Sequence, residues 1–349
     1  MIELWFGIVA TMFTVFAVLE GWDFGAGALH LVVAKTNAER REVVAAIGPL
    51  WSWHEVWLVG AGATFMLAFP KAMATAFAGY YLALWLVLWS FMLRGIAIEV
   101  GGHLAAPLWQ SFWDFVFAVA NVLLAVVFGA ALGNVIRGVP LGESGQFSLP
   151  LFTDFTTRGE VGILDWYTLS TALETLLLLG AHGATYLTLK TSGVVHERSD
   201  GAARWLWGAV AVGFAPLTLA TWTVRPEMFE GILSRPLGWL ALAVIAGATA
   251  LLVLGRRQRN EGRAFAGSCG LIVGLLGALA TGIYPEILHS TLDERHSMTA
   301  QAAASSRFSL VLALFWWPVA FVLAMVYFTF IARQYRGKVR PSQDNQGFY

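Results

Sequence analysis

The chain has 349 residues, of which 58% are hydrophobic and 13% charged, and its mean hydropathy is +0.66. A soluble domain usually carries about 25% charged residues, so this composition excludes an ordinary soluble protein. The formal net charge is zero, and no basic aromatic patch indicates nucleic acid as a partner. Cys269 is the only cysteine, which excludes an internal disulfide and a cysteine metal cluster.

Long apolar segments recur along the whole chain and predict an all-α, polytopic membrane protein. A bilayer core about 30 Å thick needs roughly 20 apolar residues per helix. The first segment begins with Glu3 and lacks a basic flank, so we expect a retained helix rather than a cleaved signal peptide. Nine segments are predicted, at about residues 4–34, 49–69, 75–98, 112–133, 163–190, 203–224, 236–254, 263–283 and 307–333.

Basic residues are distributed unevenly between alternate connections. With an outside N-terminus and a cytoplasmic C-terminus, fifteen of them fall on the cytoplasmic side and seven outside. The positive-inside rule favours this orientation, and an odd number of spans agrees with it. The cytoplasmic set is Lys35, Arg40, Arg41, Arg94, Lys190, Arg198, Arg204, Arg256, Arg257, Arg259, Arg263, Arg333, Arg336, Lys338 and Arg340. The outer set is Lys71, Arg137, Arg158, Arg225, Arg235, Arg295 and Arg307.

Two acidic residues lie inside the first apolar segment. An ionisable side chain in hydrocarbon is expensive, so each one indicates a functional site by default. Glu20 and Asp23 are three residues apart and therefore share a helix face. One interpretation gives them a role in a proton path or in the environment of a cofactor. The alternative is a structural pairing with a nearby arginine, namely Arg40, Arg41 or Arg94.

The second segment carries His54 and Glu55 among tryptophans. His54 and Glu55 point about 100° apart on a helix and so do not share a metal, whereas Trp53 and Trp57 share a face. These residues favour a proton relay or a wall facing a haem. The alternative is a hydrogen-bonded histidine that packs against aromatic rings.

Ionisable residues continue in the third and fifth segments. Arg94 and Glu99 close the third segment, and Arg94 is expected to snorkel to the cytoplasmic headgroups. In the fifth segment, Glu174 and His182 are eight residues apart and face roughly the same way. The seven histidines show no paired set of axial ligands, so we expect this chain to bind no haem and no other metal.

Three motifs follow one another in the first hundred residues. Leu19–Gly27 has the sequence LEGWDFGAG, Gly48–Leu58 has GPLWSWHEVWL, and Leu93–Glu99 has LRGIAIE. In this order they resemble subunit II of cytochrome bd-type quinol oxidases. The resemblance assigns structural motif positions to Gly21, Gly25, Gly27, Gly48, Pro49, Trp51, Arg94 and Glu99.

The second motif departs from the family pattern. Where the family carries Trp-Asp-Gly-Asn, this chain has Trp51 followed by Ser52, Trp53 and His54. We hypothesise that His54, with Glu55, replaces the missing acid in proton uptake. The competing hypothesis is that His54 only packs among the tryptophans. The candidate residues for a proton path or for the environment of subunit I are Glu20, Asp23, Ser52, His54, Glu55 and Trp57.

The resemblance implies two four-helix bundles and one peripheral helix, about nine transmembrane helices in all. The expected divisions are a first bundle (1–133), an outer loop (134–162), a second bundle (163–283), an outer loop (284–306), a peripheral helix (307–333) and a cytoplasmic tail (334–349).

The resemblance also implies a partner and an activity. Subunit I is expected to hold haems b and d and the quinol site, while this chain binds no cofactor and is not catalytic alone. The complex would oxidise quinol and reduce dioxygen to water electrogenically in the bacterial cytoplasmic membrane. A small single-helix subunit and a structural quinone or lipid remain open.

Two other function classes compete with this interpretation. A proton- or ion-coupled secondary transporter would suit the intramembrane carboxylates and histidines, although the chain lacks the clear internal repeat that such transporters often show. A haem-binding membrane cytochrome acting alone is the third. A larger haem-bearing partner encoded nearby would favour the oxidase over both.

Overall fold

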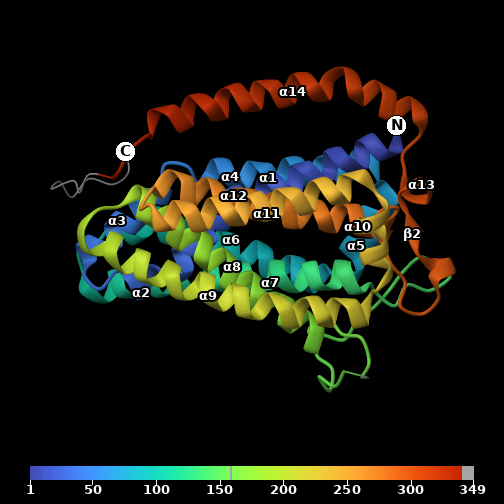
Figure 1. The fold of residues 1–349 in the computed structure, drawn as a ribbon, viewed down its shortest axis with the longest axis horizontal. Helices are drawn as coiled ribbons and strands as arrows, with labels where there is room; N and C mark the ends of the chain where they lie inside the picture. Colours follow the sequence, from blue (N-terminus) through green and yellow to red (C-terminus); the bar gives the residue numbers. More distant parts are fainter. Residues whose placement is uncertain (158, 340–349) are drawn as a thin grey trace.

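The computed structural model describes residues 1–157 and 159–339. Arg158 and Arg340, which entered the count of basic residues, lie outside the described residues, as does the remainder of the expected tail. The long helices run side by side along the longest axis of the molecule (Figure 1). They are α1 (Ile2–Ala28), α4 (Trp51–Ala68), α6 (Tyr81–Gly101), α7 (Pro107–Arg137), α8 (Trp166–Lys190), α9 (Gly193–Val224), α11 (Pro236–Arg257), α12 (Glu261–Ile283) and α14 (Arg307–Gln334).

Shorter elements lie between the long helices. They are α2 (His30–Val33), α3 (Asn37–Ile47), α5 (Pro70–Gly79), α10 (Glu227–Ser234), α13 (Ala300–Ala303), the 3-10 helix η1 (Glu294–His296) and the antiparallel pair β1 (Glu286–Leu288) and β2 (Met298–Thr299). The prediction treated α3 and α10 as connections, because neither reaches the length of a span. α3 nevertheless has a capping box between Thr36 and Glu39, which satisfies its first backbone amides.

Helix α1 is central to the fold and packs against α4, α7, α8 and α12. The approach to α8 is close, because a Cβ atom on Gly25 would lie 1.8 Å from the Leu179 carbonyl oxygen. Gly183 of α8 faces Gly25 in the same contact. Small residues let helix backbones approach in this way.

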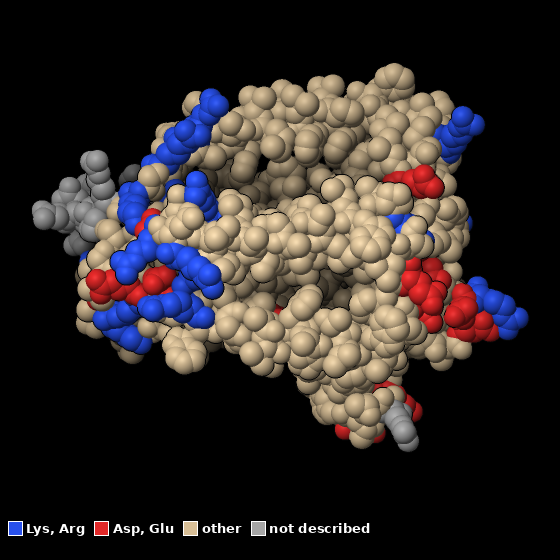
Figure 2. All heavy atoms as spheres, in the orientation of Figure 1, with Lys and Arg blue, Asp and Glu red and all other residues tan. Residues whose placement is uncertain are grey.

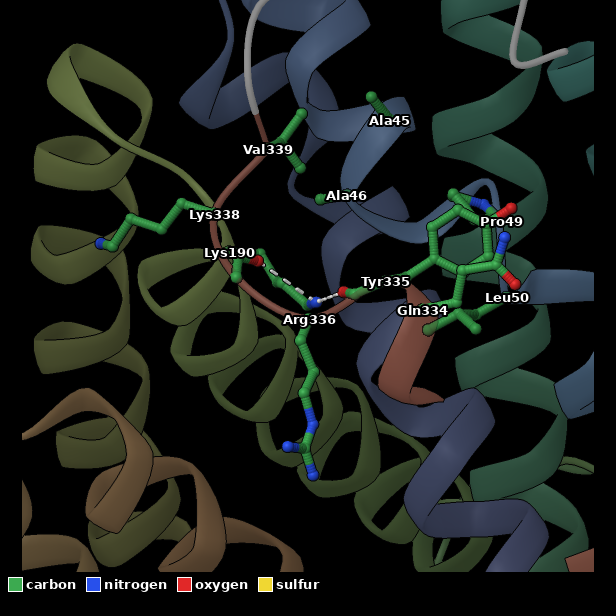
Figure 3. Close-up of a pocket in the computed structure, with 11 residues that line it drawn as sticks. Ala45, Ala46, Pro49, Leu50, Lys190, Gln334, Tyr335, Arg336, Lys338 and Val339 are labelled. Carbon is green, nitrogen blue, oxygen red and sulfur yellow. Dashed lines mark hydrogen bonds between the residues drawn. The ribbon is translucent and has the colours of Figure 1, made fainter. Parts of the chain in front are cut away.

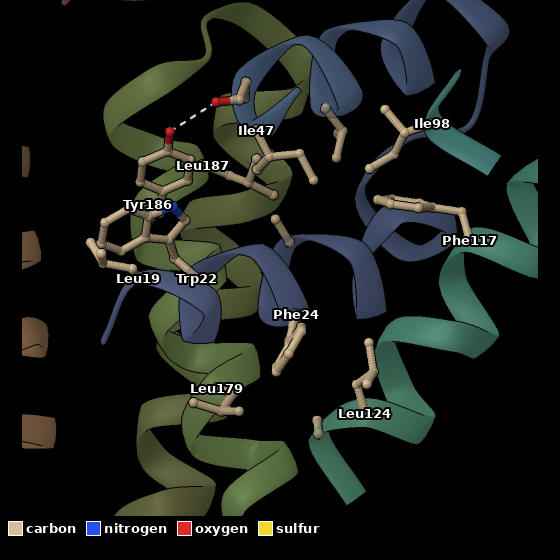
Figure 4. Close-up of a cluster of buried hydrophobic side chains, with 14 of the residues drawn as sticks. Leu19, Trp22, Phe24, Ile47, Ile98, Phe117, Leu124, Leu179, Tyr186 and Leu187 are labelled. Atoms are coloured by element: carbon tan, nitrogen blue, oxygen red, sulfur yellow. Dashed lines mark hydrogen bonds between the residues drawn. The ribbon is translucent and has the colours of Figure 1, made fainter. Parts of the chain in front are cut away.

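Aromatic rings fill the core around α1 (Figure 4). Trp22 stacks on Tyr186 of α8 with ring centroids 5.2 Å apart, and Phe24 stacks on Phe128 of α7 at 5.8 Å. The Tyr186 hydroxyl donates a hydrogen bond of 2.8 Å to the Ala46 carbonyl of α3. This core holds α3 against the end of α1 that carries the acidic residues.

The all-α membrane architecture is confirmed, whereas the number of spans stays a prediction. Seven helices are long and apolar enough to cross a membrane, namely α1, α6, α7, α9, α11, α12 and α14. The remaining two predicted spans, α4 and α8, are 18 and 25 residues long and contain buried ionisable side chains. The division into two bundles also stays a prediction, because α1 contacts helices of both.

Helix α14 lies along one face and is fastened mainly near its ends (Figure 1). The Trp5 indole donates to the Leu310 carbonyl at 3.3 Å, beside the start of α14. Past its other end, the Lys190 ammonium donates to the Tyr335 carbonyl at 2.6 Å (Figure 3). The Val339 amide donates to the Lys190 carbonyl at 2.7 Å. Between these attachments most large apolar side chains of α14 are exposed.

Lysine and arginine side chains gather at the end of the molecule where α14 ends (Figure 2). The opposite end shows both acidic and basic side chains in this view, and the middle is almost free of charge on the visible face. An uncharged band between two charged ends is the arrangement expected for a protein that spans a bilayer.

Candidate functional site

Four ionisable side chains from α1, α4 and α6 meet in the interior. Glu20, Asp23, His54 and Arg94 are each 0% exposed. Arg94 Nη1 donates to Glu20 Oε2 at 2.6 Å, and Arg94 Nη2 donates to Asp23 Oδ2 at 3.4 Å. The same Asp23 oxygen lies 2.6 Å from His54 Nδ1. The two carboxylates meet both partners because they share one face of α1. We call these four residues the inner cluster.

The expectation that Arg94 snorkels to the headgroups is wrong. Its guanidinium is buried and lies over the ring of Phe24, with Cζ 5.2 Å from the centroid, and 5.8 Å from that of Trp51. Two carboxylates on α1 supply the opposite charge that makes this burial tolerable. The structural pairing of the acidic residues with an arginine is therefore present. Arg40, another candidate, instead donates to Asp114 at 2.9 Å.

Glu55 lies at the edge of the inner cluster. Its Oε1 atom is 3.8 Å from Arg94 Nη1, and its side chain is 28% exposed, so it connects the buried charges to the surface of α4. Ser52 and Glu99 are both exposed, and neither contributes a hydrogen bond to the cluster among the described residues. The structure thus brings Glu55 to the other charges and leaves Ser52 and Glu99 outside.

His54 both hydrogen-bonds and packs against aromatic rings. Its ring lies 5.0 Å from Trp22 and 5.9 Å from Phe328 of α14. Trp57 contacts Phe328 as well, and Trp53 lies 4.4 Å from Tyr327. The predicted shared face of Trp53 and Trp57 is confirmed, and it is the face that α14 covers.

The remaining motif residues shape the surroundings. Gly27 is packed against the Asn121 amide of α7, and Gly21 contacts the Leu179 side chain. Gly48 ends α3 and Pro49 lies in the turn before α4, which begins at Trp51. The Gly-Pro pair therefore lies in the turn that precedes a helix, and α4 begins two residues after Pro49.

Several polar atoms around the inner cluster are buried without a hydrogen-bond partner. Buried polar atoms normally have partners, supplied by protein or by ordered water. A group of such atoms in one place indicates a region that exchanges hydrogen bonds with water or with another chain. The atoms are Glu20 Oε1, Trp22 Nε1, Asp23 Oδ1, His54 Nε2, Glu55 Oε1 and Arg94 Nε.

Two of the histidines, His54 and His182, are held by neighbouring groups of this chain. His182 Nδ1 lies 2.8 Å from Ser268 Oγ, and its Nε2 lies 3.1 Å from the Val18 carbonyl oxygen. Both rings also contact the Trp22 indole, with centroid distances of 5.0 Å for His54 and 5.9 Å for His182. Among residues 1–157 and 159–339, no group of three or more metal-ligating side chains is present.

Glu174 and His182 do not act together, although their spacing predicted a shared direction. His182 faces α1 and α12, whereas the Glu174 carboxylate lies against Gly213 of α9.

The sequence analysis missed a second group of interacting polar residues. His30, Arg40 and Asp114 form a polar contact near the basic end, and the spacing of seven residues between Asp23 and His30 is the signal that could have found it.

Comparison with known proteins identifies the family. The model of the family described as cytochrome bd terminal oxidase subunit II matches residues 1–334. The chain belongs to this family. It is therefore a subunit of a quinol oxidase, an oxidoreductase. The transporter interpretation receives no support from these comparisons.

Individual relatives agree with the family match. The chain is 30% identical to a probable cytochrome oxidase subunit 2 of Haemophilus influenzae, over 93% of this chain and 91% of the relative. It is 30% identical to cytochrome bd ubiquinol oxidase subunit 2 of Bacillus subtilis, over 88% of each. Its fold is similar to a chain in the structure of bd oxidase from Geobacillus thermodenitrificans, with a TM-score of 0.72 and 16% identity, covering 96% of this chain and 98% of that one.

Proposed function

We propose that this chain supports a haem-bearing subunit I and supplies it with protons through the inner cluster. The observation that carries the proposal is the burial of two carboxylates, an imidazole and a guanidinium beside six polar atoms without partners. Buried charge in a membrane persists when it has a partner or a task. Here Arg94 supplies the partner. The polar atoms without partners are free to exchange hydrogen bonds with water, which proton transfer requires.

The chemistry of each residue suggests its part. The imidazole of His54 can receive a proton on one nitrogen while it releases one from the other. Its Nδ1 atom bonds to Asp23, and its Nε2 atom has no partner. Arg94 keeps its protons and holds the two carboxylates in place. Glu55, partly exposed on α4, is the exit toward the surface that subunit I would cover.

We further propose that haems b and d and the quinol site belong to subunit I. The support is that His54 and His182 are each engaged by a side-chain hydrogen bond and by the Trp22 indole. Bound there, the haems would supply the electron transfer that reduces dioxygen, while the residues of this chain hold and move protons. The two predicted bundles, a small single-helix subunit and a structural quinone or lipid remain part of this proposal.

We propose the same orientation as the charge count predicts, with the N-terminus outside. The gathering of Lys and Arg at the end of the molecule where α14 ends supports it (Figure 2). Reporter fusions at Lys35 and at the end of the tail should both report a cytoplasmic position. An outside signal from either fusion would contradict the orientation or the nine spans.

The proton function is tested with His54→Gln in the assembled oxidase. Glutamine keeps the hydrogen-bonding capacity and approximate size but does not exchange protons in this way. We expect turnover to fall and its pH profile to change, while haem content and assembly stay intact. His182→Gln is the matched control, since it removes another buried imidazole outside the cluster and should leave the pH profile unchanged. A wild-type pH profile in a fully assembled His54→Gln complex would rule the relay out.

A further inference from the structure

A second polar group lies just past the end of the central helix α1, nearer the basic end of the molecule. His30 Nε2 is 2.9 Å from Asp114 Oδ1, and Arg40 Nη1 donates to Asp114 Oδ2 at 2.9 Å. The His30 side chain is 0% exposed, whereas that of Asp114 is 19% exposed. Asp114 therefore touches solvent on one side and holds a fully buried imidazole on the other.

The sequence spacing aligns this group with the inner cluster. Glu20, Asp23 and Gly27 follow one another at intervals of three or four residues and so share one face of α1, and His30 begins α2 three residues after Gly27. The seven-residue step from Asp23 to His30 crosses the turn at Leu29 between the two helices and corresponds to roughly 10 Å of helical rise. The space opposite Gly27 is filled by the amide of Asn121, because a Cβ atom on Gly27 would lie 2.2 Å from Asn121 Nδ2.

Asn121 is a polar residue placed between the two groups. It is 0% exposed, and its Nδ2 atom donates to the Phe117 carbonyl of its own helix at 2.8 Å. Its Oδ1 atom is buried without a partner, as are His30 Nδ1 and Asp23 Oδ1. Three acceptor or donor atoms in this region therefore lack partners, and roughly 10 Å is a span that two or three hydrogen-bonded waters bridge.

The charges around His30 leave Asp114 as its acidic partner. From α7 the ring faces Asp114 and Phe117, and from α3 it faces Arg40 through that carboxylate. From α9, Arg198 donates to the Val33 carbonyl and pairs with Glu39 at 2.8 Å, so these two charges offset each other. From α1, the next ionisable group along the face is Asp23.

We propose that the Asp114–His30 pair is the entrance for protons from the basic end, and that Asn121 guides them to Asp23. This inference rests on the proposed function of the inner cluster. A proton from water reaches the Asp114 carboxylate and passes to His30 Nε2. The imidazolium then releases its Nδ1 proton to water beside Asn121, and that water passes a proton to Asp23. One proton enters and one leaves, with no change in electrons. Arg40 balances the Asp114 charge and transfers nothing.

The first test compares Asp114→Asn and His30→Ala with Gln110→Ala in the assembled oxidase, reconstituted in vesicles. Gln110→Ala removes a neighbouring polar contact, the 2.7 Å bond from Asn37, at the same end of α7. Turnover and dye-detected proton uptake are measured between about pH 6 and about pH 8.5. Loss of a proton entrance slows uptake most where protons are scarce. Turnover and proton uptake in both entrance variants should therefore fall roughly tenfold at the highest pH and by less at the lowest pH. The control should keep the wild-type profile.

Chemical rescue separates a proton entrance from a structural role. Added imidazole should restore proton uptake in His30→Ala and leave Asp114→Asn unaffected, because it replaces only the deleted ring. If the complex with His30→Ala fails to assemble, His30→Gln is used instead, provided that its complex assembles. The decisive measurement is then the loss of proton uptake by His30→Gln at high pH. Uniform loss at every pH, or no loss in assembled entrance variants, overturns the entrance.

The two proposals fail differently. If His54→Gln changes the pH profile while Asp114→Asn and the His30 variants keep the wild-type profile, the entrance is wrong and the inner cluster retains its function. If none of these variants changes the profile in an assembled complex, the proposed function itself fails, and the entrance fails with it.

Discussion

Two buried groups of charged residues in this chain differ in how completely their hydrogen bonds are made. At the end opposite the basic one, Asp165 caps α8, accepting from the Tyr167 amide at 3.0 Å and the Thr168 amide at 2.9 Å. Arg137 donates to Asp165, and its second terminal nitrogen donates to Asn134 Oδ1 at 2.6 Å. Asn134 in turn donates to the Ile163 carbonyl at 2.9 Å. We call these residues the outer network.

We call the outer network closed because its buried side-chain polar atoms all have hydrogen-bond partners, and the inner cluster open because some of its atoms have none among the described residues. Within the described part of the chain, no side-chain atom of Asn134, Arg137 or Asp165 is buried without a partner, whereas every member of the inner cluster has such an atom. A fully satisfied polar network holds one structure rigidly. The outer network therefore fastens the end of α7 to the start of α8, while the open cluster can bind and release protons through water.

The largest effect is expected from Arg94→Leu in the inner cluster. This change leaves Glu20 and Asp23 buried without their cation, and removing one partner of a buried pair costs about 3–5 kcal/mol. We expect the assembled oxidase to be lost or to melt far below the wild type, as measured by yield and by thermal unfolding in detergent. Glu20→Gln combined with Arg94→Gln leaves only the Asp23 carboxylate without its cation, instead of two carboxylates, and should lose less stability. Equal losses in the two variants would show that charge compensation is not what holds the cluster.

A smaller loss of stability, with no change in proton chemistry, is expected from Asp165→Asn. Asparagine can still cap α8, but it leaves the Arg137 charge without its partner, at a cost of about 1–3 kcal/mol. Thermal unfolding of the complex should shift downward while the pH profile of turnover stays that of the wild type. A changed pH profile would remove the distinction between a closed structural network and an open one.

The smallest effect is expected at Glu286 in β1, which follows α12. The hydrogen bond from His289, together with Arg225 at 2.7 Å, holds the pKa of Glu286 below its ordinary value of 4.5. Because the pKa is lower in the folded state, the stabilisation is fully present above about pH 4.5 and is lost as the pH falls through the folded value. Glu286→Gln should lower the protection of amide hydrogens in β1 and β2 at neutral pH by less than about 1 kcal/mol. Equal protection in variant and wild type at neutral pH would contradict the assignment.

The sequence predicted the long helices and named Glu20, Asp23 and His54 of the inner cluster as candidates. Segment length and hydropathy located the long helices, and the spacing of Glu20 and Asp23 placed both on one face. It did not predict that Arg94 is buried, because the choice between the headgroups and the carboxylates depends on which helix packs against α1. The exposure of Ser52 likewise depends on the rotation of α4 about its axis.

The pairing of distant residues was the part that sequence could not supply. Asp114 and His30 lie 84 positions apart, and only the packing of α2 against α7 brings them together. The missed helices have a simpler reason. α3 and α10 are 11 and 8 residues long, so a search for membrane-spanning lengths passes over them.

The central claim, that the open cluster carries protons and the closed network does not, is tested most directly by proton uptake during a single turnover. The measurement compares Asp23→Asn with Asp165→Asn, each in a fully assembled complex. Both variants replace a buried carboxylate with its amide, and in Asp23→Asn the bond between Arg94 and Glu20 remains. Proton uptake should slow by at least roughly tenfold in Asp23→Asn and keep its wild-type rate in Asp165→Asn. Wild-type uptake in Asp23→Asn, or equal slowing in both variants, would contradict the account.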